Sequence, residues 1–395
     1  MKVPLLDLKA QYATLKNELD KAIIKVAESQ YFILGPEVEK LEESIAAYLG
    51  AKKAVGVSSG TDALLVALMA LDIKKGDEVI VPDYSFFATA GVVSRLNAVP
   101  VFVDIDPVTF NINCKKIEQK ITSKTKAIIP VHLYGQSAEM EELMQIAKKR
   151  KLKVIEDCAQ AIGAQYKDGK PVGTIGDIGC YSFFPSKNLG GYGDGGIVVT
   201  NDADLGEKLK ILRNHGAKPK YYHRIIGGNF RLDAIQAAVL NVKLPHLNDW
   251  SEKRRKNAGL YSNLFIESGL AEAEGKTKFD KNNPVLLPKA VYKPCDGSQQ
   301  QINNYHIYNQ YIIRVEDRDG LIKELKEKEI GCEIYYPVPF HKQECFKDLY
   351  GSTKENFEHS DFAAEKSLAL PIYPELTDEQ ITYVVDTIKN FIKKG

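Results

Sequence analysis

Residues 182–196 read SFFPSKNLGGYGDGG and contain Lys187, the residue that most strongly indicates the fold. Lys187 follows a strand-like run of aromatic residues and precedes a run of glycines. Partial burial of such a lysine lowers the pKa of its amine and makes it nucleophilic, so Lys187 is a candidate to form a Schiff base. Residues 191–196 match G-x-G-x-x-G, but a strand-like segment follows them where a dinucleotide-binding motif would open a helix. We therefore do not interpret them as a nucleotide-binding loop.

Two earlier segments carry groups that complement Lys187. Residues 58–64, SSGTDAL, join a strand to a helix and offer hydroxyl and N–H groups at the helix N-terminus, a ready anion site. In residues 154–160, VIEDCAQ, Asp157 stands where an apolar strand ends, and open α/β sheets bind ligands at such ends. A phosphate-binding turn, a strand-end Asp and a Lys 30 residues later suit pyridoxal 5′-phosphate, which needs an imine-forming amine and a carboxylate that keeps its ring protonated.

The first half of the chain alternates strand-like and helix-like segments. This alternation predicts parallel strands joined by right-handed crossovers, with helices on both faces of the sheet. Because no helix precedes residues 196–200, we expect a mixed sheet. The seven expected strands are Lys53–Val57, Glu78–Pro82, Pro100–Asp104, Lys126–Val131, Lys153–Glu156, Ile178–Phe184 and Gly196–Thr200. The expected helices are Leu15–Ser29, Glu37–Leu49, Thr61–Leu71, Phe86–Leu96, Ala138–Arg150, Asp204–Asn214 and Leu232–Val242.

A polar stretch after Pro245 divides the chain into two expected domains, residues 1–245 and 246–395. Residues 271–304 are rich in Lys, Asn, Pro, Gly and Gln and are expected to form a long loop. The expected elements of the smaller α/β domain are a helix-like segment to about Leu270, strands Tyr311–Val315 and Cys332–Tyr336, and helices Asp319–Lys328 and Asp378–Lys393.

The composition is that of an ordinary globular protein. Of 395 residues, 44% are hydrophobic and 27% are charged, and 53 Lys and Arg against 52 Asp and Glu give a net charge of +1. This balance argues against a nucleic-acid binder held by bulk charge. No apolar stretch approaches the roughly 18 residues of a membrane helix, and the first residues lack a signal-peptide pattern. The six Cys and seven His match no metal-binding spacing. We expect a cytoplasmic protein with reduced thiols, no metal, and no nucleic-acid or membrane partner.

The order of several motifs resembles the DegT/DnrJ/EryC1/StrS family of sugar aminotransferases. The motifs are ILGPE (33–37), GTDAL (60–64), EDCAQ (156–160), SFFPSKNLGGYGDGG (182–196), GGNFRLDAIQAA (227–238) and YYPVPFH (335–341). The resemblance covers nearly the whole chain. It implies an α/β fold of the aspartate-aminotransferase type (fold type I), with a mixed seven-stranded sheet in the large domain and a smaller C-terminal α/β domain. It also implies a homodimer whose active sites lie at the subunit interface.

Carried over by motif position, the resemblance assigns roles to individual residues. Lys187 would be the Schiff-base lysine and general acid/base, and Asp157 would hold the pyridine nitrogen. The other cofactor contacts would be Gln160 near the ring hydroxyl, Phe86 on the ring face, Gly60, Thr61 and Ser182 at the phosphate, and Asn229 at the phosphate of the neighbouring subunit. The substrate contacts would be Tyr222, His223, Arg231, Tyr335, Tyr336 and His341. A core position for Phe86 and a plain solvated loop at 221–224 remain alternatives.

The resemblance also implies transamination of a nucleotide-linked keto-sugar, with glutamate as the usual amino donor. Relatives that aminate C-4 tend to carry a run like Thr-Thr-Gly-Glu-Gly-Gly after the lysine. Residues 191–196 read GYGDGG, which looks like relatives that aminate C-3. We therefore expect a UDP- or dTDP-linked 3-keto-hexose to be converted to a 3-amino sugar for a surface glycan or lipid A. The Pro185-Ser186-Lys187 form looks more like UDP-sugar members.

Two other functions remain open. One is amination at C-4, and the other is a non-catalytic cofactor-binding regulator on the same fold. The presence of Lys187, Asp157 and Gln160 argues against lost catalysis. Dehydratases of the family replace the lysine with His, so Lys187 also argues against that activity.

Overall fold

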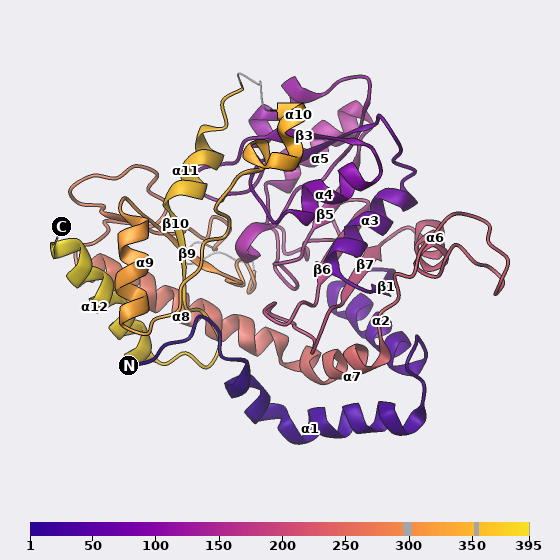
Figure 1. The fold of residues 1–395 in the computed structure, drawn as a ribbon, viewed down its shortest axis with the longest axis horizontal. Helices are drawn as coiled ribbons and strands as arrows, with labels where there is room; N and C mark the ends of the chain where they lie inside the picture. Colours follow the sequence, from indigo (N-terminus) through magenta and orange to yellow (C-terminus); the bar gives the residue numbers. More distant parts are fainter. Residues whose placement is uncertain (295–301, 351–354, 395) are drawn as a thin grey trace.

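The computed structural model describes residues 1–294, 302–350 and 355–394. Its large sheet contains β1 (Lys53–Val57), β2 (Glu78–Pro82), β3 (Val99–Val103), β4 (Thr125–Ile128), β5 (Lys153–Asp157), β6 (Ile178–Ser182) and β7 (Gly196–Thr200). The strand order is β1-β7-β6-β5-β4-β2-β3 (Figure 1). Strand β7 is antiparallel to β1 and β6, and the other neighbouring pairs are parallel. The expected mixed seven-stranded sheet is thus confirmed.

Helices cover both faces of this sheet, as the alternation predicts. They are α2 (Pro36–Leu49), α3 (Gly60–Ala70), α4 (Ala88–Arg95), α5 (Met140–Arg150), α6 (Ala203–Arg213) and α7 (Ala234–Lys243). Successive strand residues point to opposite faces, so Val198 packs in the core that contains α3 and α4, whereas Ile197 and Val199 pack in the core that contains α2 and α7. Helix α3 is buried because its residues are apolar on nearly every side.

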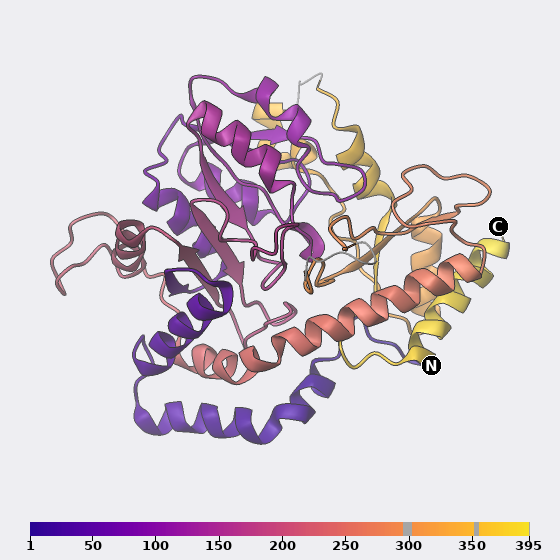
Figure 2. The same cartoon turned by 180° about the vertical axis from the view of Figure 1, so that it is seen from behind.

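The first helix is longer than expected. α1 (Leu8–Ser29) begins seven residues before the predicted start at Leu15, because Asp7 caps it by accepting hydrogen bonds from the N–H groups of Lys9 and Ala10. The sequence pattern places the start of this helix too late, because the first turns of α1 carry few apolar residues. Helix α1 packs against α7 and runs along the outer edge of the molecule (Figure 2).

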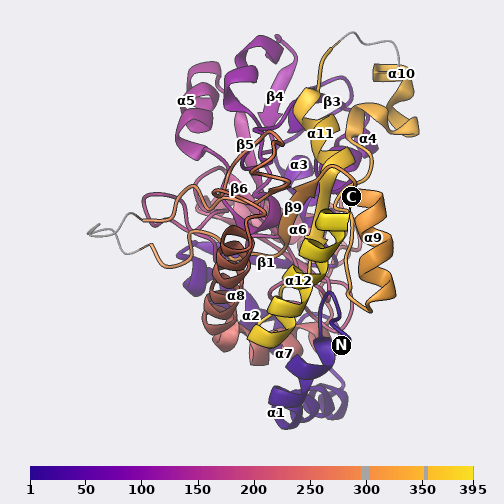
Figure 3. The same cartoon turned by 90° about the vertical axis from the view of Figure 1, so that its left-hand side faces the viewer.

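The C-terminal part forms a second core. Helix α8 (Leu247–Glu267) leads from the large sheet to a three-stranded antiparallel sheet of β8 (Val285–Leu286), β9 (Tyr311–Val315) and β10 (Ser367–Leu370). Helix α12 (Asp378–Lys394) lies between α8 and α9 (Arg318–Glu327), as the side view shows (Figure 3). The N-terminal Val3 also packs in this core and pairs with Ile330.

Two expectations for the C-terminal part were wrong. Residues 332–336 form no strand, because only Glu333 pairs with β10 while side-chain hydroxyls of the large domain take the backbone groups of Tyr335 and Tyr336. The expected loop at 271–304 contains β8, which is too short to show a pattern. Helix α11 (Glu358–Lys366) and strand β10 were not predicted.

The structure tests several other expectations only in part. The boundary after residue 245 falls within a 3-10 turn, Leu244–His246, directly before α8, and the domain division stays a prediction. Residues 295–301, which include Cys295 and part of the expected loop, lie outside the described residues. The other five cysteines are free thiols. In the described part of the chain, no helix combines the length and apolar character that crossing a membrane requires.

Candidate active site

Six strands of the large sheet end at one edge. Strands β2, β3, β4, β5 and β6 are parallel, and β1 runs in the same direction because both β1 and β6 are antiparallel to β7. The carboxyl ends of such strands are the usual ligand-binding edge of an α/β sheet. Most residues expected to bind the cofactor lie at or just after the strand ends on this edge. They are Gly60 and Thr61 after β1, Phe86 after β2, Asp157 and Gln160 at the end of β5, and Ser182 and Lys187 at the end of β6.

The turn before α3 fits a phosphate group. A Cβ on Gly60 would lie 2.7 Å from the Cβ of Ser182, so glycine is what lets these two segments meet. Ser59 caps α3 by accepting a hydrogen bond from the N–H of Asp62 at 3.0 Å. Within the described residues, the N–H groups of Gly60 and Thr61 donate to no protein acceptor. The helix N-terminus therefore offers free donors to an anion beside the hydroxyl of Ser182.

Asp157 is buried at the end of β5. Its Oδ2 accepts a hydrogen bond from the hydroxyl of Thr89 at 2.8 Å, and its Oδ1 accepts one from the N–H of Ala159 at 3.1 Å. Burial raises the pKa of Asp157, and these two donors and the charge of Lys187 oppose the rise. A buried carboxylate in this setting gains from a positively charged partner, so Asp157 fits a protonated pyridine nitrogen.

Lys187 is partly buried beyond the end of β6. Burial lowers the pKa of Lys187 to about 8, while the charge of Asp157 acts in the opposite direction. In the part of the chain that the structure describes, the Nζ of Lys187 forms no hydrogen bond and no ion pair. An amine with a lowered pKa and no protein partner can attack an aldehyde, so Lys187 fits the expected role.

Gln160 connects the large sheet to the C-terminal part of the chain. Its Oε1 accepts a hydrogen bond from the N–H of Tyr134 at 2.7 Å, and its Nε2 donates to the hydroxyl of Tyr336 at 3.0 Å. The ring of Tyr336 lies 6.0 Å from the ring of Phe86. Phe86 is 56% exposed, so it is not a core residue, and its ring is available to face a bound group.

Tyr335 and Tyr336 are held at the same edge by a buried tyrosine that the sequence analysis missed. The hydroxyl of Tyr84 donates to the carbonyl of Tyr335 at 2.6 Å and accepts from the N–H of Tyr336 at 2.7 Å. The hydroxyl of Tyr134 also donates to the carbonyl of Tyr335. The structure thus brings Tyr335 and Tyr336 to Gln160 and Phe86.

His341 lies in a different environment. Its Nδ1 lies 2.6 Å from Oδ2 of Asp83, its N–H donates to Oδ1 of Asp83, and its Nε2 lies 3.5 Å from Asp361. Burial raises the pKa of Asp83 to about 6, and His341 opposes the rise. Because carboxylates face both imidazole nitrogens, this geometry favours a structural link over contact with a sugar.

Tyr222 and His223 lie far out on a loop after α6. This loop, which spans residues 214–229, projects from the body of the chain (Figures 1 and 2). Its ends pair through Asn214 and Asn229, and Tyr222 is 70% exposed. The structure of one chain therefore does not bring Tyr222 and His223 to Lys187, and these two residues are available to a second chain.

Asn229 and Arg231 lie at the base of that loop. The N–H of Ser58 donates to the carbonyl of Phe230 at 3.1 Å, which places the segment beside the turn before α3. Arg231 donates to Oδ1 of Asn214 at 2.9 Å, and the side chain of Asn229 is exposed.

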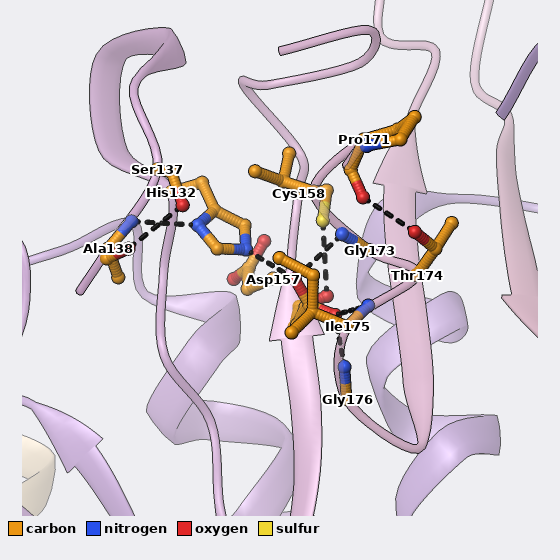
Figure 4. Close-up of polar contacts among 12 residues, drawn as sticks. His132, Ser137, Ala138, Asp157, Cys158, Pro171, Gly173, Thr174, Ile175 and Gly176 are labelled. Carbon is orange, nitrogen blue, oxygen red and sulfur yellow. Dashed lines mark hydrogen bonds and ion pairs between the residues drawn. The ribbon is translucent and has the colours of Figure 1, made fainter. Parts of the chain in front are cut away.

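Behind Asp157, on the other face of β5, lies a buried cluster that the sequence analysis did not consider (Figure 4). The carboxylate of Glu156 accepts three hydrogen bonds of 2.6 to 2.8 Å from N–H groups of the turn at 173–176. It also lies 2.9 Å from Nε2 of His132. The N–H of Ala138 donates to Nδ1 of His132 at 3.0 Å, so the imidazole proton is on Nε2 and is donated to Glu156.

The same cluster brings together side chains that could ligate a metal. His132, Glu156 and Cys158 place one potential ligand atom each within 4.8 Å of one another, although they are dispersed in the sequence. However, Glu156 already accepts four hydrogen bonds, which is the capacity of a carboxylate, and the free lone pair of His132 accepts one from Ala138. Burial raises the pKa of the Cys158 thiol. The cluster is therefore arranged as an internal hydrogen-bond network.

Sequence reasoning missed three residues that organise the site. Thr89 stands three positions after Phe86, and a hydroxyl at that spacing could have been noted as a partner for a strand-end carboxylate. No sequence signal shows that Tyr84 and Tyr134 hold the backbone of Tyr335, because these residues are 251 and 201 positions from it.

Comparisons with known proteins identify the family of this chain. The pattern of the DegT/DnrJ/EryC1/StrS aminotransferase family matches residues 13–389. A pleiotropic regulatory protein of Geobacillus stearothermophilus is 50% identical over 100% of this chain and 99% of its own length. The UDP-N-acetyl-3-dehydro-alpha-D-glucosamine 3-aminotransferase of Acidithiobacillus ferrooxidans is 43% identical over 98% of this chain and 97% of its own. The crystal structure of DesV of S. venezuelae has a TM-score of 0.89 and 38% identity, and the match covers 99% of this chain and 98% of DesV. This chain belongs to the DegT/DnrJ/EryC1/StrS family of pyridoxal-phosphate-dependent aminotransferases.

Proposed function

We propose that this protein transfers an amino group from glutamate to C-3 of a nucleotide-linked 3-keto-hexose, with UDP as the favoured nucleotide and dTDP as the other. The product would be a 3-amino sugar for a surface glycan or lipid A. The observation that carries the proposal is the 43% identity, over nearly the full length of both chains, to a relative named as a UDP-sugar 3-aminotransferase. The GYGDGG run after Lys187 supports the same position on the sugar.

Each residue of the site would have its own role in this reaction. Pyridoxal 5′-phosphate, when bound, supplies an aldehyde and a protonated ring that withdraws electrons. Gly60, Thr61 and Ser182 would hold its phosphate, and Asp157 would keep its ring nitrogen protonated. The Nζ of Lys187 would attach the cofactor and, once released by the amino donor, would take the α-proton of that donor.

The remaining contacts would lie around that centre. Phe86 would cover one face of the ring, and Gln160 would bind near its hydroxyl. Tyr335 and Tyr336 would face the sugar, since the ring of Tyr336 lies against Phe86.

We also propose that the protein acts as a cytoplasmic homodimer with shared active sites. The loop at 214–229 supports this arrangement, because it projects from the body of its own chain and leaves Tyr222 70% exposed. Asn229 would reach the phosphate held by the partner subunit, and Arg231 would lie beside it.

The test compares the wild type with Lys187→Ala. Wild-type protein supplied with pyridoxal 5′-phosphate should show a visible absorption band that disappears when glutamate is added, and Lys187→Ala should show neither change. Loaded wild-type protein should then aminate UDP-linked 3-keto sugars faster than 4-keto sugars. A Lys187→Ala protein that still responds to glutamate would contradict the assignment of Lys187. A preference for 4-keto sugars would contradict amination at C-3.

A second candidate function follows from the 50% identity to the pleiotropic regulatory protein of Geobacillus stearothermophilus. That name supports a regulator as the second candidate, and on this fold we take it to be a non-catalytic protein that binds the cofactor. The free amine of Lys187 next to Asp157 favours catalysis instead. Cofactor binding without any response to glutamate or to other amino donors would support the regulator.

A further inference from the structure

Asn188, directly after Lys187, is buried, and both polar atoms of its side chain form hydrogen bonds. Its Nδ2 donates to the carbonyl of Ile307 at 3.0 Å, and its Oδ1 accepts from Nδ2 of Asn309 at 2.8 Å. Asn188 is 3% exposed and Asn309 is 6% exposed. The nitrogen and the oxygen of the Asn188 side chain therefore both bind one short segment, residues 307–309, which is 119 or more positions away in the sequence.

That segment is in turn bound to the loop that holds Gln160. The N–H of Ile307 donates to the carbonyl of Gly135, and the N–H of Asn309 donates to the carbonyl of Tyr134, both at 2.9 Å. The N–H of Tyr134 then donates to Oε1 of Gln160 at 2.7 Å. An unbroken series of hydrogen bonds therefore connects the residue beside Lys187 with Gln160.

The backbone around Lys187 is also held by neighbouring contacts. The N–H of Lys187 donates to the carbonyl of Phe184, and the N–H of Gly191 donates to the carbonyl of Phe183, both at 2.8 Å. The side chain of Lys243 donates to the carbonyl of Gly190 at 2.8 Å. Among these contacts, Asn188 is the side-chain anchor directly next to the lysine, so its loss should change where the amine lies.

We propose that Asn188 is a positioning residue, which fixes the place of Lys187 relative to Gln160 and Asp157 by binding residues 307–309. The proposal deepens the proposed function and rests on it, since it takes Lys187 as the cofactor lysine. It assigns no contact between Asn188 and cofactor or substrate. Residues 307–309 would thus set the geometry of the site without touching the reacting groups.

The first test measures the amine of Lys187 in the full-length chain prepared without cofactor. Labelling with an amine reagent at a series of pH values, followed by mass spectrometry of the Lys187 peptide, gives a pH midpoint. The wild type should give about 8. In Asn188→Ala the loosened lysine should reach water, and the midpoint should rise by about one unit or more towards the ordinary lysine value of about 10.4. Loaded Asn188→Ala should lose about 10- to 100-fold in kcat, with KM for glutamate changed less than about twofold.

The control is Asn257→Ala, which removes another buried amide that donates to backbone carbonyls, those of Tyr373 and Leu376 in the second core. This variant should be destabilised but should keep the Lys187 midpoint and kcat of the wild type. If Asn188→Ala does not fold, Asn309→Ala removes the outer partner and should shift the midpoint in the same direction.

The outcomes separate the two proposals. An unchanged midpoint and kcat in Asn188→Ala, or in Asn309→Ala where only that variant folds, would overturn the positioning role and leave the proposed function standing. The same holds if Asn257→Ala shifts the midpoint equally, because the effect would then be general loosening. Transamination by Lys187→Ala would overturn the proposed function itself, whatever the Asn188 variants show.

Discussion

At the scale of single residues, burial sets the chemistry of Lys187. Its pKa is lowered to about 8 because burial disfavours the ammonium more than the nearby charge of Asp157 favours it. The unprotonated fraction should therefore rise from about a tenth at about pH 7 to about nine tenths at about pH 9. We expect the rate at which cofactor-free protein is labelled at Lys187 to rise about tenfold over this range and then to level off. Labelling that still rises steeply above about pH 10 would show an ordinary lysine.

The site residues differ in how far the sequence reveals them. Lys187 and Asp157 could be predicted because each follows a recognisable strand and has a residue type that the chemistry needs. Thr89 was missed because its bond to Asp157 spans 68 positions and depends on how α4 packs beside β5. For His341, the motif position predicts a substrate contact, and the structure adds a partner that the sequence did not reveal, Asp83.

At the scale of elements, Glu156 joins three of them. Its carboxylate binds the turn at 173–176 and His132, and it lies within β5 next to Asp157. In Glu156→Gln, whichever way the amide is turned, its NH₂ group must face two of the four donors. Leaving those donors unpaired should lower the free energy of unfolding by about 2–5 kcal/mol. Urea unfolding near neutral pH measures this loss.

A surface carboxylate provides the control for that measurement. Glu118 pairs with Lys149 and Arg150 on the exposed surface, so Glu118→Gln should lower the free energy of unfolding by less than about 1 kcal/mol. Equal losses in the two variants would mean that the buried network adds nothing beyond an ordinary charge.

The large sheet could be predicted and the small one largely could not. Strands such as β2 and β7 are buried on both faces and appear in the sequence as nearly continuous apolar runs. Strand β10 has four residues and β8 has two, so neither shows a periodicity. Residues 332–336 have the composition of a strand, but hydroxyl groups of Tyr84 and Tyr134 occupy the backbone of Tyr335 that a strand would pair. Such competition depends on tertiary contacts and leaves no local signal.

At the scale of the whole molecule, the proposal of a shared site rests on where one chain places the loop at 214–229. Asp157 ends β5 and Lys187 follows β6, whereas the loop at 214–229 projects from the body of the chain (Figure 1). Exposed aromatic residues on and around this loop, such as Tyr221 and Tyr222, would be covered in a dimer. The role of Asn229 distinguishes a site within one chain from a site shared by two chains. Its neighbour Phe230 binds the turn before α3 of its own chain, so Asn229 could serve either its own site or that of a partner.

Co-expression of two inactive variants can distinguish a shared site from a site within one chain. In a symmetric dimer with shared sites, a hybrid of Lys187→Ala and Asn229→Ala chains has one site with both changes and one site with neither. Co-expression in equal amounts should make about half of the dimers hybrids, and so restore about a quarter of the wild-type rate although each variant alone is nearly inactive. If Asn229 serves the site of its own chain, every site in the hybrid carries one change, and the mixture should be no more active than the variants alone. Tagging each chain differently and purifying on both tags isolates the hybrid, which should then show about half of the wild-type rate. An isolated hybrid without activity would contradict the shared site, and full activity of Asn229→Ala alone would contradict the role of Asn229.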